Sequence, residues 1–116
     1  MALTFLSPAG AEVKVEQYTL RAIESGFYPV MKRGFKKAQE LVWLEKGDIW
    51  KFGTTKNFNP FKRYTQKYLD NVGEFGVEYF PEFRGTLKEA LELERMKIMN
   101  YIKQNGFLPR GNKIIK

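Results

Sequence analysis

The chain contains no cysteine and no histidine. This excludes cysteine nucleophiles, Ser-His-Asp triads, imidazole general bases and Cys/His zinc sites. Any catalysis must therefore use carboxylates, tyrosine, lysine, arginine, hydroxyl groups or a hard metal ion held by oxygen ligands. The absence of cysteine also agrees with a cytoplasmic protein, because disulfides belong mainly to oxidising compartments.

Long apolar segments are absent as well. The longest unbroken apolar runs, such as 41–44, have about four residues, far fewer than the roughly 20 that span a bilayer. The first residues lack a charged region followed by a long apolar stretch, so no signal peptide is expected. With 116 residues, we expect one small globular protein located in the cytoplasm and having no membrane partner.

Acidic residues are the minority, with 13 Asp and Glu against 20 Lys and Arg, a formal net charge of +7. Clustered Lys and Arg displace counterions from phosphate backbones, so the charge points to a polyanionic partner. No acid occurs from 51 to 67, and none follows Glu94. If the fold joins these basic tracts, they form a positive groove around one carboxylate, which suits phosphodiester binding with a divalent metal. The alternative is that they are two solvated basic faces.

The first 40 residues are predicted to form an extension that consists of a hairpin and a short helix. Alternating apolar residues on both sides of a Ser-Pro-Ala-Gly turn predict the hairpin over 1–16. The helix is predicted over 17–24 and ends at a Ser-Gly pair. The basic run at 32–37 is predicted to be a solvated loop or a helix start.

The middle of the chain predicts strands and one helix. The segments 41–44 and 49–53 are expected to pair as a β-hairpin, because a Lys-Gly-Asp turn separates them. A helix is predicted over 60–69, with an Asn cap and proline at its first position. Residues 77–84 alternate like a strand, in which Pro81 indicates an edge strand or a bulge.

A capping box over 86–89, Thr-Leu-Lys-Glu, predicts the start of a long helix. This helix is expected to run to about residue 104, where Asn-Gly stops it. Its apolar residues follow helical spacing and define one buried stripe, and Glu94 falls inside it. Glu92 lies about 160° away, near the opposite face. A carboxylate in a buried stripe requires an Arg or Lys partner, a hydrogen-bond donor or a metal ion.

From 41 to 113 the order of elements resembles the GIY-YIG nuclease superfamily. The shared order is strand, turn, strand, an arginine on the next helix, a third strand, a helix that carries one glutamate, and a late asparagine. The second strand, Trp-Lys-Phe-Gly-Thr-Thr at 50–55, looks most like the YKIG-x-T form of phage-type and related subgroups. The resemblance implies a small α+β domain over 41–116, with a three-stranded antiparallel sheet flanked by helices and residues 1–40 as its extension.

The resemblance also implies a metal-dependent endonuclease that hydrolyses DNA phosphodiester bonds, with duplex DNA favoured over single strands. Glu94 would hold a single Mg²⁺ or Mn²⁺ ion, and Arg63 would clamp the phosphate. Gly53 would allow close approach, and Asn112 would support the site. Such hydrolysis needs a metal, a water activator and charge stabilisation, but no histidine. We expect a monomer or weak dimer whose nucleic-acid contacts come from Lys56, Lys62, Lys67, Arg110 and Lys113.

This chain departs from the family at the tyrosines of the first two strands, which position or deprotonate the attacking water. The first position aligns with Trp43, and the second aligns with Lys51, or with Trp50 if the register slips by one. Tryptophan has no acceptor and cannot act as a base. The preferred substitutes are Tyr64 and a desolvated Lys51 with a lowered pKa, ahead of Tyr68.

Two other functions are consistent with the sequence. The same fold could bind nucleic acid while cutting slowly or not at all, since the expected strand tyrosines are missing. A small RNA-binding protein could instead use Trp43, Trp50 and Phe52 of the hairpin as a stacking surface.

Overall fold

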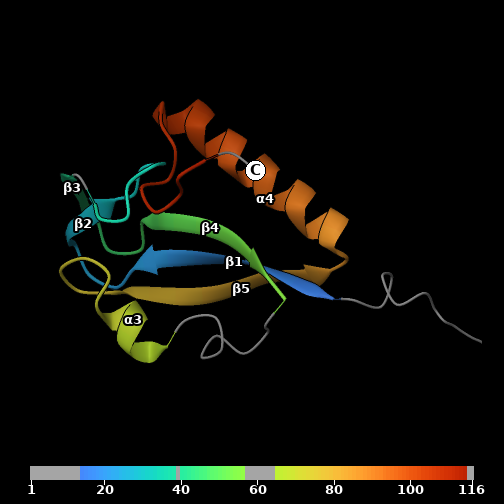
Figure 1. The fold of residues 1–116 in the computed structure, drawn as a ribbon, viewed down its shortest axis with the longest axis horizontal. Helices are drawn as coiled ribbons and strands as arrows, with labels where there is room; N and C mark the ends of the chain where they lie inside the picture. Colours follow the sequence, from blue (N-terminus) through green and yellow to red (C-terminus); the bar gives the residue numbers. More distant parts are fainter. Residues whose placement is uncertain (1–13, 39, 57–64, 115–116) are drawn as a thin grey trace, which may run out of the picture.

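The computed structural model describes residues 14–38, 40–56 and 65–114 (Figure 1). As predicted, this part of the chain has an α+β fold with a three-stranded antiparallel sheet, in the order β4-β1-β5. A separate two-stranded sheet pairs β2 with β3. The elements are β1 (Val15–Ala22), β2 (Gly26–Val30), β3 (Glu40–Leu44), β4 (Ile49–Thr55), α3 (Gln66–Asp70), β5 (Val77–Gly85) and α4 (Leu87–Asn105).

Strand β1 is the centre of the larger sheet, so the prediction of a helix over 17–24 is wrong. Its backbone pairs with β4 on one side and with β5 on the other. Every residue of β1 except Arg21 is buried. Because both faces are covered, the polar side chains Gln17 and Thr19 are buried as well as the apolar ones, so the sequence alternation is not matched by an alternation in exposure. The predicted hairpin over 1–16 lies, up to residue 13, outside the described residues.

The predicted hairpin between 41–44 and 49–53 does not form. Strand β3 pairs with β2, and β4 pairs with β1. Backbone hydrogen bonds of Ala22 with Gly47 and Asp48 join the two pairs into one long bent ribbon. The Lys-Gly-Asp turn thus bends one arm of the ribbon rather than reversing the chain. Strands before and after residue 40 pair with each other, so residues 15–30 are part of the same fold as residues 41–114.

The basic run at 32–37 lies in the exposed loop between β2 and β3, one of the two predicted structures. Strand β5 confirms the prediction for 77–84. Pro81 lies on this edge strand, where the register with β1 shifts between Gln17 and Tyr18, so both expectations for the proline are met. Helix α3 begins at Gln66, because Thr65 is extended and caps it by accepting a hydrogen bond from the Tyr68 amide. The first part of the predicted helix, 60–64, lies outside the described residues.

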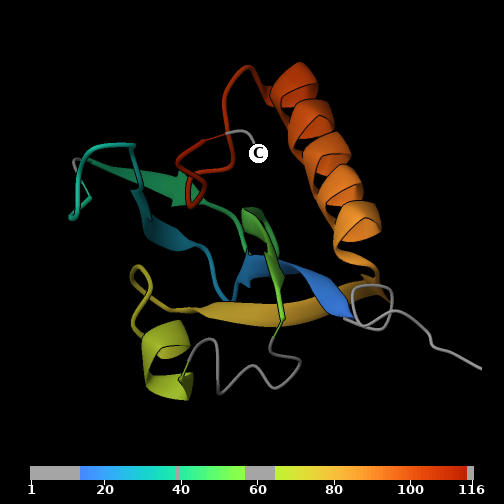
Figure 2. The ribbon, with the colours of Figure 1, turned by 45° about the vertical axis from the view of Figure 1, so that its right-hand side comes forward.

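Helix α4 confirms the strongest local prediction. Both hydrogen bonds of the capping box are present, and the helix stops at Gly106 in the left-handed conformation (φ 85°). The hydrogen bonds from Thr86 hold the pKa of the Glu89 carboxyl below its usual value. The helix runs alongside the sheet, while α3 lies on the other side (Figures 1 and 2). Ala90, Glu94 and Ile98 form its buried stripe, and Leu87 at the first turn is exposed.

The main apolar core lies between the two sheets and the segment around α3. It contains Tyr18, Leu20, Ala22, Tyr28, Leu44, Trp50, Leu69, Val72 and Val77. Trp50 and Phe52 are only 2% and 5% exposed, and Trp43 is on another sheet. The stacking surface considered for RNA therefore does not exist, because two of its three rings are buried. Within the described ranges, no helix has the length and apolar character to cross a membrane.

Candidate functional site

Glu94 is a fully buried carboxylate with one unused oxygen. Its Oε1 accepts a 2.5 Å hydrogen bond from Thr54 Oγ1 of β4. Its Oε2 is buried and has no hydrogen-bond partner among the described residues. None of the ion pairs found in the described residues includes Glu94, so the Arg or Lys partner considered for it does not occur there. A buried carboxylate oxygen without a donor costs free energy, which favours a functional role over a stabilising one.

The other fully buried glutamate in the described chain, Glu16, shows the contrast. Its Oε1 accepts from Arg84 Nε and its Oε2 from Tyr79 Oη, both at 2.7 Å. Both oxygens are therefore satisfied, as expected for a carboxylate that contributes to stability. Among the described residues, both oxygens of Glu16 thus have donors, whereas Glu94 Oε2 has none.

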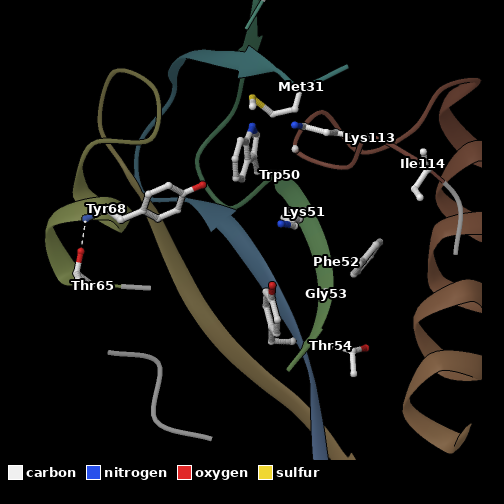
Figure 3. A pocket seen from close by; sticks show the side chains of 12 residues that line it. Met31, Trp50, Lys51, Phe52, Gly53, Thr54, Thr65, Tyr68, Lys113 and Ile114 are labelled. Carbon is white, nitrogen blue, oxygen red and sulfur yellow. Dashed lines mark hydrogen bonds between the residues drawn. The ribbon is translucent and has the colours of Figure 1, made fainter. Parts of the chain in front are cut away.

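A cleft of about 670 Å³ opens along β4, next to the residue that holds Glu94. Thr54 lines this cleft and also donates to Glu94, so Thr54 connects the cleft to the buried carboxylate. Figure 3 shows Thr65 and Tyr68 on one side of β4, with Lys113 and Ile114 on the other. The lining residues are Tyr18, Met31, Trp50, Lys51, Phe52, Gly53, Thr54, Thr65, Tyr68, Gly111, Lys113 and Ile114.

The cleft brings together members of the two basic tracts. Lys51 belongs to the first tract and Lys113 to the second, and both line the cleft. Lys97, also of the second tract, instead donates to Gln17 at 2.6 Å and pairs with Glu82 at 3.7 Å. The fold therefore brings part of the basic charge into the cleft, while Lys97 contacts Gln17 and Glu82 instead.

Tyr18 is the site residue that sequence reasoning missed. It lies opposite Gly53 in the β1–β4 pairing, and a Cβ atom at Gly53 would collide with the Tyr18 ring and hydroxyl. The phenol therefore covers the glycine at the wall of the cleft, and its ring stacks on Tyr79 with centroids 4.8 Å apart. The strand beside β4 thus carries a tyrosine after all.

The expectation that Trp43 takes the place of this tyrosine is wrong. Trp43 lies on β3, which pairs with β2 and not with β4. It is 53% exposed, packs edge-on against Phe27 and donates its indole N–H to Glu45. The signal that could have identified Tyr18 is the alternation of Tyr18, Leu20 and Ala22, which has the period of a strand.

Replacing Gly53 by alanine is expected to destabilise the protein by about 1–3 kcal/mol, because the new methyl group overlaps the Tyr18 ring. Thermal unfolding measures the cost. In a Tyr18→Leu background the added cost of Gly53→Ala should largely disappear, since the colliding ring is gone. An equal cost in both backgrounds would show that the two residues are not in contact.

Asn112 fastens the segment after α4 to the edge of β4. Its Oδ1 accepts from the Phe52 amide and its Nδ2 donates to the Phe52 carbonyl, both at 2.9 Å. The neighbouring Gly111 amide donates to the Trp50 carbonyl at 2.6 Å. Because Phe52 engages both polar groups of the Asn112 side chain, this residue supports the cleft and positions Lys113 rather than offering a group to a ligand.

Replacing Asn112 by alanine is expected to cost about 2–4 kcal/mol, since it leaves two buried backbone groups of Phe52 without partners. Chemical denaturation provides the measurement. Asn100→Ala, an exposed asparagine on α4, is the matched control and should be nearly neutral. A cost as small as that of the control would contradict the bridging role.

The other predicted site residues divide into two groups. Lys51 and Tyr68 line the cleft, whereas Lys56 after β4 and Lys67 on α3 are exposed, and Arg110 is half-buried. Arg63, Tyr64 and Lys62 lie outside the described residues. Burial raises the pKa of the Tyr101 and Tyr28 hydroxyls.

Glu94 offers one carboxylate oxygen to a divalent ion, and because this oxygen is buried, an ion reaches it only when the covering groups move. No cluster of three or more Asp or Glu side chains that could hold a metal occurs among the described residues. The unsatisfied Oε2 of Glu94 is a hard oxygen donor beside the Thr54 hydroxyl. Mg²⁺ is commonly held by one or two carboxylates plus waters and substrate phosphates, so a single ligand of this kind is sufficient.

Comparisons of the chain with protein-family models, with curated proteins and with solved structures find no match. The function must therefore be inferred from the residues of the cleft themselves.

Proposed function

We propose that this protein is a metal-dependent endonuclease that hydrolyses DNA phosphodiester bonds at the cleft beside β4. One observation carries the proposal: Glu94 is fully buried, it is held by a residue of the cleft wall, and its Oε2 has no partner among the described residues. A buried carboxylate that only stabilises the fold is expected to have a donor for each oxygen, as Glu16 has in Arg84 and Tyr79. A site for a divalent cation accounts for the vacant oxygen.

The side chains of the cleft would divide the work as follows. Glu94 would hold one Mg²⁺ or Mn²⁺ ion, which when bound supplies charge stabilisation to a phosphate and lowers the pKa of water. Thr54 orients the carboxylate through its hydroxyl. Lys51 and Lys113 attract the DNA backbone into the cleft. Tyr18, over Gly53, would orient the attacking water or accept its proton.

The pairing of β1 with β4 supports the proposed likeness to the GIY-YIG superfamily. It sets a tyrosine strand beside the strand Trp-Lys-Phe-Gly-Thr-Thr, which is the juxtaposition that the family requires. Arg63 keeps its proposed role as phosphate clamp on the strength of that likeness. Duplex DNA is the proposed substrate, the proposed assembly is a monomer or weak dimer, and the proposed location is the cytoplasm.

Incubation with supercoiled plasmid and Mg²⁺ or Mn²⁺ tests the proposal. Wild-type protein should nick and linearise the plasmid, and Glu94→Ala should not. Equal cleavage by both proteins would overturn the assignment of Glu94. Chelation of the divalent ion should stop cleavage by the wild type.

A DNA-binding protein that cuts slowly or not at all is the second candidate. The observation that favours it is the complete burial of the Glu94 side chain, since an ion can reach Oε2 only if the covering groups move. Absence of cleavage by the wild type, together with DNA binding that weakens linearly with log[salt], would support this candidate over the first.

A further inference from the structure

We propose that a second phosphate-binding site lies next to the cleft, in a basic seam formed by Lys32, Arg33, Arg110 and Lys113. The seam is the place where the loop after β2 meets the segment after α4. The inference rests on the proposed function, because one DNA backbone would occupy the cleft and the seam together. The site would fix the direction in which the DNA backbone leaves the cleft, namely past Lys113.

Backbone hydrogen bonds build the seam from segments far apart in the sequence. The Met31 amide donates to the Arg110 carbonyl at 2.7 Å. The Lys113 ammonium donates to the Phe35 carbonyl at 3.3 Å. Asn112, between them, is fastened to β4. The basic run at 32–37, which the sequence predicts as a solvated loop or a helix start, is thereby held against the second basic tract.

The seam borders a groove of about 210 Å³ that lies next to the cleft. Lys32, Arg33, Arg110 and Lys113 line this groove. Met31 and Lys113 line the groove and the cleft alike. Figure 3 shows these two side chains close together at one end of the cleft. A chain of phosphates can therefore pass from one site to the other along a positive wall.

The cations of the seam are available to an anion. Within the described part of the chain, Lys32 is the only one of the four that forms an ion pair, at 3.0 Å from Glu40. The Arg110 guanidinium lies over the Phe107 ring at 3.7 Å from its centroid, which holds it in one orientation. A guanidinium fixed in this way presents a planar fork that matches the oxygens of a phosphate. The seam thus has both the charge and the preorganisation of a backbone contact.

Salt-dependent DNA binding tests the seam. The parent is Glu94→Gln, measured without divalent ions, so that binding is separated from cleavage. Arg33→Ala with Arg110→Ala is expected to weaken duplex binding and to lower the slope of log K against log[salt] by about 1–2, since each lost phosphate contact removes about 0.9. Fluorescence anisotropy with a labelled duplex at several NaCl concentrations measures both quantities.

Two further variants separate phosphate binding from general charge and from packing. Lys88→Ala with Lys103→Ala removes the same charge from exposed positions of α4 and should leave the slope unchanged. Arg33→Lys with Arg110→Lys keeps the charge and should retain most of the slope. The seam is overturned if both alanine pairs behave alike, or if the lysine pair loses as much as the alanine pair. If the parent itself does not bind duplex DNA, the proposed function fails as well.

Discussion

Glu94→Gln is expected to reduce metal-dependent cleavage about a thousandfold, because a metal ion supplies several kcal/mol of charge stabilisation and each 1.36 kcal/mol is tenfold in rate. Glutamine keeps the shape of the side chain and an oxygen that can accept from Thr54. It loses the anionic charge that would bind a cation. Initial rates of plasmid nicking at fixed Mg²⁺ concentration measure the loss.

The same substitution has an expected effect on stability that does not depend on activity. Without divalent ions the variant should unfold at the temperature of the wild type or above it, because it no longer buries an unpaired charge. Mg²⁺ should raise the unfolding temperature of the wild type, by the equivalent of about 2.7 kcal/mol at 100 times its Kd, and leave that of the variant unchanged. Thermal scans with and without Mg²⁺ measure this difference.

Glu92→Gln is the matched control for both measurements. It makes the same chemical change on the same helix, at an exposed position. It should leave cleavage and the effect of Mg²⁺ unaltered. If Glu94→Gln cleaves as fast as this control, or responds equally to Mg²⁺, Glu94 is not the metal ligand.

Tyr18→Phe is expected to reduce cleavage by about 100-fold or more while leaving the fold intact, since general acid–base groups contribute 10²–10⁴. Phenylalanine keeps the ring that stacks on Tyr79 and covers Gly53, and removes only the hydroxyl. Single-turnover cleavage rates across a range of pH measure the effect.

The alternatives for the water activator are tested beside it. Tyr68→Phe and Lys51→Met change other side chains that line the cleft, and Tyr64→Phe tests the residue outside the described part of the chain. Each should lower the rate less than Tyr18→Phe does. A larger loss in any one of them, with Tyr18→Phe near wild type, would move the role to that residue. Tyr28→Phe controls for the removal of a buried hydroxyl away from the cleft.

Local signals predicted the elements that depend on neighbours in the sequence. The capping box, the Asn-Gly stop and the helical spacing identified α4 to within a residue and identified Glu94 as buried. Pro81 correctly indicated an edge strand with an irregular register. These features depend on hydrogen bonds and packing among a few neighbouring residues, so the local sequence is enough to predict them.

The errors lie where pairing partners are distant. Strand β1 was predicted as a helix although Tyr18, Leu20 and Ala22 alternate with the period of a strand, because its partners β4 and β5 come from distant parts of the chain. The turn at 46–48 was predicted to pair the strands on its two sides. These strands, β3 and β4, instead pair with β2 and β1 from residues 15–30. Because of both errors the sequence did not identify Tyr18 as a site residue, since Tyr18 joins the site only by pairing opposite Gly53.

The sequence by itself determined the available chemistry: no imidazole or thiol, a surplus of basic charge, and one carboxylate placed inside the apolar stripe of a capped helix. Only the tertiary structure decided that Thr54 satisfies one oxygen of that carboxylate while the other has no donor in the described chain, and that Tyr18, Lys51 and Lys113 line the same cleft as Thr54. The reason is physical. Composition and helical phase are local properties, whereas the partner of a strand and the neighbours of a buried atom depend on which distant segments the folded chain packs together.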